Sequence, residues 1–352
     1  MWNNPAFDDH EKITLVHDRA SGLRAIIAIH STHLGPSAGG TRFWHYADSA
    51  AALTDALRLS QGMSYKNALA GLPMGGGKAV ILADANRTKP EEMMLAFGDA
   101  VEKLGGEYVT AEDVGITEAD MDIVHRRTAH VTGLSAEEGE SKVGTDPGPF
   151  TSHGIYLGLK QAVKHKLGKD SMAGVHVAVQ GTGSVGSGLA RYLAEDGAVL
   201  TLADVDQARA ARLADELGAK TVNADAIMTV PCDVFSPNAL GAILNADTIA
   251  RLDCAVIAGG ANNQLATAGD GDALNARGIL WAPDYVINAG GIISVAVEYL
   301  SRDGSVSATI DDVNARIAQI PDRLEQIWVG SEASGEAANR VADAMARRAI
   351  GR

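Results

Sequence analysis

Hydrophobic and polar positions in the first 140 residues follow two different periods. Two apolar runs, ITLVHD and LRAIIAIH, flank Arg-Ala-Ser-Gly and predict two strands joined by a short turn. Apolar residues at helical spacing predict a helix over about 48–59, and a second helix is expected over about 90–104. A glycine-rich bend and a short strand, AVILA, lie between these helices, and a strand in GEYVTAEDVG follows the second. The first section is therefore expected to fold as an α/β domain.

The pattern after residue 140 alternates regularly between strands and helices. A loop rich in turn-forming residues, GTDPGPFTS, begins this section, and a helix is expected over about 152–166. Strands are predicted in HVAVQ, AVLTLAD, DVFSP, CAVIAG and DYVINAG, with helices between them. This rhythm is typical of a Rossmann-type, doubly wound parallel sheet, so we predict an α/β fold with two domains. The last section, from about residue 311, is predicted to be helical.

The length supports this division, because 352 residues exceed one ordinary domain. We place the first domain at 1–142 and the second at 143–324. The helices at about 325–352 are expected to pack back on the first domain, since chain termini often lie close together.

Composition and charge exclude several classes of protein. The net charge of −14 argues against nucleic acid as a partner, because phosphate binding requires a basic surface. No apolar run has the length of a membrane span, and the acidic, polar start MWNNPAFDDHEK differs from a signal peptide. We therefore expect a cytoplasmic protein without membrane contact. Cys232 and Cys254 are too few for a disulfide framework and too far apart for a CxxC site, so no metal is expected.

A dinucleotide-binding fingerprint lies at the first strand of the second section. The strand HVAVQ runs into GTGSVG, and an amphipathic helix and a second strand follow. Gly181 permits the tight turn, Gly183 allows close approach of a pyrophosphate, and Gly186 lets helix and strand pack closely. The first N–H groups of the helix then offer a partial positive charge to the phosphates.

An acidic residue at the end of the second strand indicates which dinucleotide is bound. Asp204 lies about twenty residues after the glycines, where a carboxylate accepts hydrogen bonds from the adenosine ribose and repels a 2′-phosphate. We therefore predict NAD as the cofactor. Asp206, two positions later, is the competing ribose ligand.

Two lysines and one aspartate lie within apolar and glycine-rich stretches of the first domain. Lys78 follows three glycines, but the segment is no P-loop, since Leu72 and Ala79 stand where Gly and Ser or Thr are required. Oxidative deamination of an amino acid needs a cation for the carboxylate, a base with a lowered pKa and a proton shuttle. The chemistry of Lys66, Lys78 and Asp113 suits these three roles.

These stretches resemble the Glu/Leu/Phe/Val dehydrogenase family, in particular its leucine and phenylalanine dehydrogenase branch. The resemblance covers nearly the whole chain, with GPSAGGTR, GLPMGGGKAV, TAEDVG, GTGSVG, CDVFSPNALGA, IAGGANNQL and APDYVINAGG in family order. It implies a catalytic, substrate-binding first domain, an NAD-binding second domain, and an active site in the cleft between them. It also implies C-terminal helices that return to the first domain, and a homo-oligomer, dimeric or larger, assembled through the N-terminal strands.

The resemblance also implies roles for individual residues. Gly39, Gly40 and Lys66 would hold the substrate carboxylate, with help from Asn262 unless that residue is a helix cap. Lys78 would polarise the carbonyl and activate water, and Asp113 would move protons. Asn288 either orients the nicotinamide amide or serves a turn before two glycines. The implied side-chain pocket consists of Ala38, Ala111, Thr132, Ile292 and Val295.

The cofactor is expected to contact the glycine turn, the end of the second strand and the loops after later strands. These positions are Gly181, Thr182, Gly183, Ser184, Val185, Gly186, Asp204, Val205, Ser236, Pro237, Asn238, Ala258, Gly259, Asn262 and Asn288. The loops SPNA and GGANN follow strands of the second domain, where an open α/β sheet binds its ligands.

The implied pocket favours leucine, valine and isoleucine as substrates. No cationic residue occurs among its positions, which disfavours glutamate. Ala38 widens the pocket as in phenylalanine dehydrogenases, so phenylalanine or another aromatic amino acid is the alternative. A pocket discriminates a single methylene by only about 1–3 kcal/mol, and several aliphatic substrates should therefore react.

Two other classes of protein share the nucleotide domain. A 2-hydroxy-acid dehydrogenase typically uses a catalytic His with an Arg clamp, and the lysine pair with Asp113 fits amine chemistry better. A non-catalytic NAD-binding protein has no need of Lys66, Lys78 and Asp113. A strict requirement for ammonia in the reductive direction separates the first of these classes from an amino-acid dehydrogenase.

Overall fold

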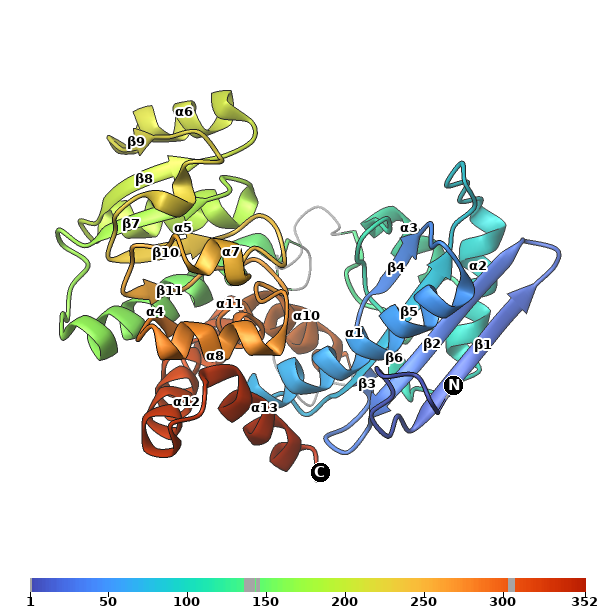
Figure 1. Cartoon of the computed structure of the whole chain (residues 1–352). Coiled ribbons are helices and arrows are strands. Elements are labelled where there is room, and N and C mark those ends of the chain that lie inside the picture. Colours follow the sequence, from blue (N-terminus) through green and yellow to red (C-terminus); the bar gives the residue numbers. More distant parts are fainter. Residues whose placement is uncertain (1, 136–142, 144–145, 303–307) are drawn as a thin grey trace. The chain divides into compact units, whose positions relative to one another are not determined.

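The chain divides into two compact units in the computed structural model, which describes residues 2–135, 143, 146–302 and 308–352. Unit 1 comprises Met1–Thr145, Ser294–Asp312 and Ala346–Arg352, and unit 2 comprises Asp146–Ile293 and Val313–Met345 (Figure 1). The predicted boundary after residue 142 and the first residues of the predicted loop, 144–145, lie outside the described residues. The predicted substrate and cofactor domains stay predictions, because packing alone does not show what either unit binds.

Unit 1 is built on a mixed sheet in the order β1-β2-β5-β3-β6, with β4 paired to β5 (Figure 1). The predicted hairpin is confirmed, since β1 (Lys12–Asp18) and β2 (Leu23–Ser31) pair antiparallel. β5 (Gly75–Leu82) runs antiparallel to β2. The remaining strands run parallel to their partners and are β3 (Ser37–Ala38), β4 (Thr41–Trp44) and β6 (Tyr108–Val109).

The glycines before Lys78 are part of a strand, and the prediction of a bend there was wrong. A Cβ on Gly76 would lie 2.0 Å from the backbone nitrogen of Ser64 on α1 (Ser49–Leu69). A Cβ on Gly75 would lie 1.9 Å from the carbonyl oxygen of Ser31 on β2. These glycines therefore let a helix and a neighbouring strand approach β5 closely, which no larger residue permits.

The helix predicted over 48–59 is correct in place but extends to Leu69. Its second half carries buried polar residues at helical spacing, so the apolar pattern ends before the helix does. Ser60 lies 3.0 Å from Nε2 of His10, and Asn67 donates to the carbonyl of Gly75 at 2.6 Å. Hydrogen bonds thus replace apolar contacts on the face that packs against the sheet.

Side chains along β2 and β5 alternate between two covered faces of the sheet. One face packs against α1 through Ile26, Ala28, Ala52, Ala56, Leu57 and Val80. The other face packs against α2 (Glu91–Glu102) and α3 (Glu118–His125) through residues that include Ile27, Ile29, Ile81, Phe97 and Met121. Lys78 is two positions before Val80 on β5, so its side chain belongs to the face that α1 covers.

The predicted helix over 90–104 is confirmed as α2, whereas α3 lies in residues for which no element was predicted. The strand expected in GEYVTAEDVG is limited to Tyr108–Val109. A capping box starts α3, since Thr117 accepts from the N–H of Asp120 and the carboxylate of Asp120 accepts from the N–H of Thr117. Asp113 lies in the loop between β6 and α3.

Unit 2 contains a parallel sheet in the order β12-β11-β10-β7-β8-β9 (Figure 1). The strands are β7 (His176–Gln180), β8 (Val199–Ala203), β9 (Lys220–Thr221), β10 (Val234–Pro237), β11 (Val256–Ile257) and β12 (Leu280–Trp281). The chain adds strands on one side of β7 and then returns to add strands on the other, so the order switches between β7 and β10. This is the doubly wound Rossmann order, and the predicted fold class is confirmed.

The helices of unit 2 connect these strands. They are α4 (Gly148–Leu167), α5 (Ser184–Glu195), α6 (Gln207–Leu217), α7 (Ala246–Ile249) and α8 (Ala268–Ala276), with a 3₁₀ turn at Ile227–Thr229. α4 begins earlier than predicted because Pro149 occupies its first turn, where a missing N–H costs no hydrogen bond. None of the helices in the described part of the chain is both long and apolar enough to span a membrane.

The strand predicted in DYVINAG is wrong, because these residues form α9 (Asp284–Ile287) and the start of α10 (Gly290–Ser301). The last strand, β12, precedes them. Asp284 is buried and accepts a hydrogen bond from the N–H of Gln264 at 2.7 Å. A short apolar run has the same pattern in a buried strand and in a buried helical turn, so periodicity alone does not separate the two.

The last section is helical, as predicted, and consists of α11 (Ile310–Ile317), α12 (Ile320–Ser334) and α13 (Ala338–Ala349). α12 packs against α4 and α9, and its buried Trp328 donates to the carbonyl of Trp281 at 3.0 Å. These contacts belong to unit 2. Of the residues predicted to return to the first domain, 346–352 belong to unit 1.

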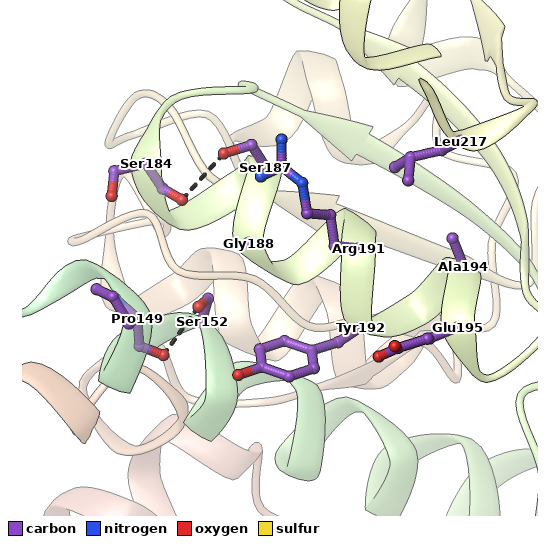
Figure 2. A pocket seen from close by; sticks show the side chains of 10 residues that line it. All are labelled: Pro149, Ser152, Ser184, Ser187, Gly188, Arg191, Tyr192, Ala194, Glu195 and Leu217. Carbon is purple, nitrogen blue, oxygen red and sulfur yellow. Dashed lines mark hydrogen bonds between the residues drawn. The ribbon is translucent and has the colours of Figure 1, made fainter. Parts of the chain in front are cut away.

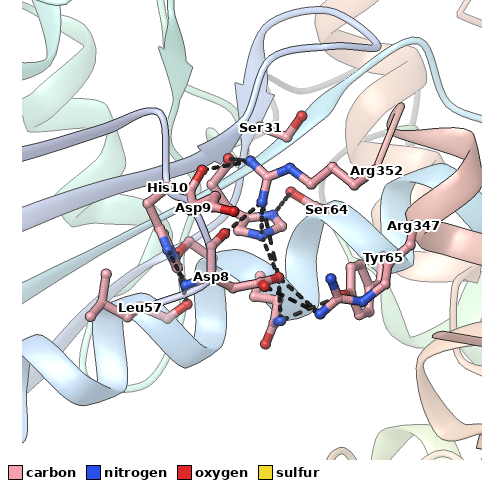
Figure 3. Close-up of polar contacts among 12 residues, drawn as sticks. Asp8, Asp9, His10, Ser31, Leu57, Ser64, Tyr65, Arg347 and Arg352 are labelled. Carbon is pink, nitrogen blue, oxygen red and sulfur yellow. Dashed lines mark hydrogen bonds and ion pairs between the residues drawn. The ribbon is translucent and has the colours of Figure 1, made fainter. Parts of the chain in front are cut away.

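The two ends of the chain meet within unit 1 (Figure 3). Arg352 donates to the carbonyls of Asp9 and His30, both at 2.8 Å, and Arg347 contacts the carboxylate of Asp8 at 3.1 Å. The imidazole of His30 is fully buried between Asp8, at 3.2 Å, and Ser64, at 2.8 Å. Burial, with the charge of Arg352, lowers the pKa of His30 to about 4, so this side chain is neutral near pH 7.

Candidate active site and dinucleotide site

Lys78 enters the candidate active site from the middle of β5. It lies opposite Ala28 of β2, and only 6% of its surface is exposed. A buried ammonium loses most of its hydration, which is costly unless an anion lies close to it.

Asp113 supplies this anion from the loop after β6. Nζ of Lys78 lies 2.5 Å from Oδ2 of Asp113. The loop is fixed on both sides of Asp113 by β4, because Thr41 donates to the carbonyl of Ala111 at 2.8 Å and Phe43 to that of Val114 at 2.9 Å. Backbone hydrogen bonds therefore hold the carboxylate where the lysine reaches it.

The two groups shift one another's pKa in opposite senses. Burial lowers the pKa of Lys78, and the charge of Asp113 opposes this effect without cancelling it, so the pKa stays below its ordinary value. Burial raises the pKa of Asp113, but Lys78 and then Arg42 outweigh burial and hold the pKa below its usual range. Asp113 is therefore a carboxylate at neutral pH, and Lys78 loses its proton more readily than a lysine in water.

Gly39 and Gly40 join β3 to β4 beside this ion pair. A Cβ on Gly40 would lie 2.9 Å from the Cβ of Asp113 and 2.5 Å from the carbonyl oxygen of Glu112. A Cβ on Gly39 would lie 1.8 Å from the carbonyl oxygen of Gly77. Backbone at Gly39 and Gly40 thus borders the residues around Lys78, and a side chain has no room there.

Lys66 lies on α1, the helix that covers the same face of the sheet. Its neighbours Ser64 and Asn67 contact Gly76 and Gly75 of β5, and the side chain of Lys66 is half-buried. Unit 1 therefore brings Gly39, Gly40, Lys78 and Asp113 together, with Lys66 on the helix packed against them.

The predicted pocket residues are divided between the two units. Ala38 is buried on β3, and Ala111 and Thr132 lie beside Thr110, whose carbonyl accepts from the N–H of Thr132 at 2.8 Å. Val295 also belongs to unit 1, whereas Ile292 belongs to unit 2, and both are half-buried on α10. Their use as a side-chain pocket stays a prediction.

The predicted dinucleotide turn has the backbone that its three glycines suggest. Gly181 has a φ of 88°, and a Cβ on Gly186 would lie 1.9 Å from the carbonyl oxygen of Gly181. Gly183 is the N-cap of α5, and among the described residues no atom outside its chain neighbours lies within 4 Å of a Cβ built on it. This open space beside the first N–H groups of a helix fits a pyrophosphate, so the residues present fit a dinucleotide.

The other predicted cofactor loops lie beside this turn at the carboxyl ends of the strands. Asn238 joins them, because its amide donates to Ser236 at 3.0 Å and accepts from the N–H of Gly260 at 2.8 Å. A Cβ on Gly181 would lie 3.0 Å from the backbone of Asn238, and one on Gly259 would lie 2.3 Å from the carbonyl oxygen of Pro237. Unit 2 thus brings the predicted loops together at the point where the strand order switches.

Asp204 accepts four hydrogen bonds at the end of β8. Oδ2 accepts from the N–H and the hydroxyl of Thr182 at 2.7 and 3.0 Å, and Oδ1 accepts from the N–H of Asp206 at 2.9 Å and from Arg209 at 2.7 Å. Burial raises the pKa of Asp204, but these bonds, that of Arg209 first, lower it to about 2. The competing candidate, Asp206, lies outside the strand and caps α6 by accepting from the N–H of Arg209 at 3.0 Å.

Asn262 and Asn288 form a contact within unit 2. Asn288 is buried and donates to the side chain of Asn262 at 2.7 Å and to the carbonyl of Gly260 at 3.1 Å, whereas Asn262 is exposed. The fully buried Gln264 shapes the same loop by donating to the carbonyls of Gly259 and Ala261 at 2.7 and 3.1 Å. Val205, by contrast, is 86% exposed beyond the end of β8.

A pocket of about 670 Å³ lies along α5, between residues of α4 and Leu217 at the end of α6 (Figure 2). Its lining includes Pro149, Ser152, Arg191 and Tyr192, and shares Ser184 with the predicted cofactor positions. Arg191 is engaged by Glu216 at 2.7 Å. Among the described residues, Ser184 is the one lining residue that this pocket shares with the predicted cofactor positions.

Three residues of these sites escaped the sequence prediction: Arg42, Arg209 and Gln264. The first and last belong to the motifs GPSAGGTR and IAGGANNQL, so the sequence contained a signal for them. Arg42 also follows Gly40 at strand spacing, which places the two positions on one face. Arg209 carried no such signal, because its contact with Asp204 depends on the start of α6.

The Rossmann-type sheet of unit 2 fits a dinucleotide and the lysine–aspartate pair of unit 1 suits proton transfer, a combination that a dehydrogenase with a nicotinamide cofactor requires. Residues 10–130 match the model of the Glu/Leu/Phe/Val dehydrogenase dimerisation domain, and residues 200–349 match that of glutamate/leucine/phenylalanine/valine dehydrogenase. The chain therefore belongs to the Glu/Leu/Phe/Val dehydrogenase family, as its motifs predicted.

Individual relatives agree with this assignment over nearly the full chain. Leucine dehydrogenase of Geobacillus stearothermophilus is 46% identical over 342 residues, which cover 97% of this chain and 91% of the relative. Valine dehydrogenase of Streptomyces virginiae is 44% identical over 341 residues, which cover 95% and 93%. The crystal structure of L-tryptophan dehydrogenase from Nostoc punctiforme has a TM-score of 0.85 at 39% identity and covers 97% and 96%. The prediction of an amino-acid dehydrogenase is confirmed.

Proposed function

We propose that this protein oxidises L-amino acids with branched aliphatic side chains to 2-oxo acids and ammonia, reversibly and with NAD. The observation that carries the proposal is the buried ion pair of Lys78 and Asp113, 2.5 Å apart beside the glycine backbone of Gly39 and Gly40. The names of the leucine and valine dehydrogenase relatives support an aliphatic amino acid as the substrate.

The groups of unit 1 suit the proton transfers of this reaction. The predicted cofactor residues of unit 2 would hold the dinucleotide, which would supply the acceptor for hydride from the substrate. Lys66 and the backbone at Gly39 and Gly40 bind the carboxylate, and neutral Lys78 takes a proton from the water that adds to the α-carbon. The Asp113 carboxylate takes a proton from the substrate ammonium before hydride leaves, and returns it to the nitrogen as the carbon–nitrogen bond breaks. The sum converts amino acid, NAD⁺ and water into 2-oxo acid, ammonium, NADH and one proton.

The substrate side chain is assigned from the small and apolar positions of the proposed pocket. Ala38, Ala111 and Thr132 present no cation to a second carboxylate, so glutamate is disfavoured. An aromatic substrate is the second candidate, favoured by the small Ala38 and by the likeness to a tryptophan dehydrogenase.

A panel of L-amino acids tests this function. We expect NADH formation at alkaline pH with leucine, valine and isoleucine, weaker turnover with phenylalanine and tryptophan, and none with glutamate or with 2-hydroxy acids. In the reverse direction, NADH oxidation with a branched 2-oxo acid should require ammonium. Turnover of 2-hydroxy acids, or no turnover across the panel, would contradict the proposal.

NAD is proposed as the cofactor because Asp204 presents a negative charge where the ribose hydroxyls of the adenosine would bind. Arg209 competes with the ribose for Asp204, since its guanidinium already pairs with this carboxylate and is 43% exposed. The ribose hydroxyls would share Asp204 with Arg209, whereas a 2′-phosphate would meet the carboxylate first.

Replacing Asp204 by asparagine should reduce the preference for NAD over NADP. The change removes a negative charge and releases Arg209 to bind a 2′-phosphate, and a hydrogen bond to a charged group contributes about 1.5–3 kcal/mol. We expect the ratio of kcat/KM for NAD to that for NADP to fall about 10- to 100-fold. Asp206→Asn is the matched control, because it removes the same charge from the helix cap. A reduced ratio in the Asp206 variant alone would transfer the role to Asp206.

A homo-oligomer assembled through the N-terminal strands is also proposed. β1 is an edge strand that exposes Leu15 to 74%, and the family domain that matches residues 10–130 is described as a dimerisation domain. Light scattering of the purified protein decides this point, and a monomer at all concentrations would rule it out.

A further inference from the structure

Arg42 connects the candidate active site to α1 through a row of alternating charges. It pairs with Val80 across β4 and β5, which places its side chain on the α1 face, as for Lys78. Nε of Arg42 lies 3.5 Å from Oδ2 of Asp113, the oxygen that Lys78 also contacts. Nη1 of Arg42 lies 2.9 Å from Oδ2 of Asp55 on α1. The guanidinium thus bridges two carboxylates that belong to different elements.

Asp55 is itself held in place. The hydroxyl of Tyr46 donates to Oδ2 of Asp55 at 2.8 Å, the same oxygen that Arg42 contacts. Arg58 contacts the other oxygen, Oδ1, at 3.0 Å and is 49% exposed, whereas Asp55 is only 16% exposed. Arg42 and Tyr46 thus share Oδ2 of Asp55, which fixes Arg42 from the side of α1. Arg58 binds Oδ1 of Asp55 from the solvent side.

We propose that Arg42, oriented by Asp55 and Tyr46, is a positioning residue that holds the Asp113 carboxylate in line with Lys78. The inference rests on the proposed function, in which Asp113 and Lys78 transfer protons. The contact of 3.5 Å is an ion pair without a hydrogen bond, so Arg42 orients Asp113 by charge and leaves its oxygens able to exchange protons. Lys78 contacts the same carboxylate. The spacing between Lys78 and Asp113 therefore depends on how Arg42 holds that carboxylate.

The charge of Arg42 also acts on both proton-transfer groups. It lowers the pKa of Lys78 and of Asp113, so its removal should raise both. The titratable and charged groups around the pair come from β4, α1, β5, β6 and the loops: Arg42, Tyr46, Asp55, Arg58, Lys78, Tyr108, Glu112 and Asp113. Asp55 raises the pKa of Lys78 through its own charge, whereas Arg58 is not among the principal charges that shift it.

Steady-state kinetics across pH test the proposal with four variants. Arg42→Gln should lower kcat about 10- to 100-fold, with KM for the amino acid changed less than about threefold, since a misplaced catalytic group affects the chemical step. The rising limb of its pH–rate profile should move to higher pH because Lys78 regains a higher pKa. Arg42→Lys keeps the charge and should restore the position of the limb without restoring full kcat. Tyr46→Phe should lower kcat severalfold, and Arg58→Gln, the matched control, should change neither quantity.

Two further measurements distinguish a misfolded variant from failure of the Arg42 proposal and from failure of the proposed function. Melting temperatures within about 3 °C of the parent show that the variants are folded. The ¹³C chemical shift of Cε of Lys78 as a function of pH, measured by NMR, reports the pKa of this lysine without any turnover. An Arg42→Gln variant with the parent's kcat and the parent's titration of Lys78 overturns the proposal. A parent enzyme inactive with every amino acid overturns the proposed function instead, and the titration then still decides whether Arg42 acts on Lys78.

Discussion

Replacement of Lys78 by glutamine is expected to lower kcat for amino-acid oxidation by about 10⁴-fold, the upper end of what a general base contributes. The side chain is 6% exposed, so water has little access to take over the proton transfer. Glutamine is slightly shorter than lysine and still donates hydrogen bonds, but it has no base near neutral pH. Stopped-flow measurement of NADH formation gives the chemical step directly.

The control for this prediction is Lys12→Gln, which removes the same charge from an exposed ion pair with Glu107 in the same unit. It should retain parental kcat. NADH binding, followed by fluorescence, should be unchanged in both variants, because the predicted cofactor residues lie in unit 2. A Lys78→Gln variant that keeps more than a tenth of the parental kcat would falsify the assigned role.

The pH dependence of oxidation follows from the lowered pKa of Lys78. The base must be neutral, so the rate rises as pH increases through this pKa and falls as pH decreases through it. Burial places the value below the ordinary 10.5 of lysine. The rising limb of kcat/KM in the free enzyme should therefore lie below pH 10.5, and in the Lys78→Gln variant this limb should be absent.

Asp113→Asn is expected to lower kcat by about 10²- to 10³-fold, within the range for loss of a positioned acid or base. Asparagine has nearly the same shape, but its amide does not exchange protons at neutral pH. The change also removes the only carboxylate within 4 Å of Lys78 among the described residues, and the buried ammonium is then poorly compensated. Lys78 should respond by losing its proton at lower pH.

This response gives a signature that loss of structure does not reproduce. The rising limb of the pH–rate profile should move to lower pH in Asp113→Asn, because Asp113 raises the pKa of Lys78. It should move to higher pH in Arg42→Gln, because Arg42 lowers this pKa. Asp122→Asn is a matched control, since Asp122 accepts hydrogen bonds from Ser135 in the same unit, away from the pair. If the rising limbs of Asp113→Asn and Arg42→Gln moved in the same direction, the opposite effects of these two charges on Lys78 would be disproved.

Most elements of the fold follow from local patterns, and the errors have a common physical cause. The N-terminal hairpin, α2 and the strands β7, β8 and β10 have periods and turn residues that report their structure directly. Residues 75–77 and 284–290 were misassigned because their conformation is set by neighbours distant in sequence. Glycines usually break a strand, but those of β5 are required where Ser64 and Ser31 approach it.

The candidate sites show the same limit. Lys78, Asp113, Asp204 and the glycine turn were predictable because each belongs to a motif with its own chemistry. The contacts that tune them were not, since the pairings of Arg42 with Asp113 and of Arg209 with Asp204 depend on how strands and helices meet. Sequence periodicity indicates the face on which a side chain lies, whereas the partner across that face is a property of packing.

The discontinuous composition of unit 1 has a consequence for biosynthesis. This unit needs residues 294–312 and 346–352 as well as its first 145, so a ribosome-bound chain cannot complete it until residue 352 has emerged. Until then, Asp8 and the buried edge around His30 lack Arg347 and Arg352, the two cations that bind them in the finished protein. Domains generally fold in the order in which they are made. Here the section synthesised first is completed last, after the residues that finish unit 2.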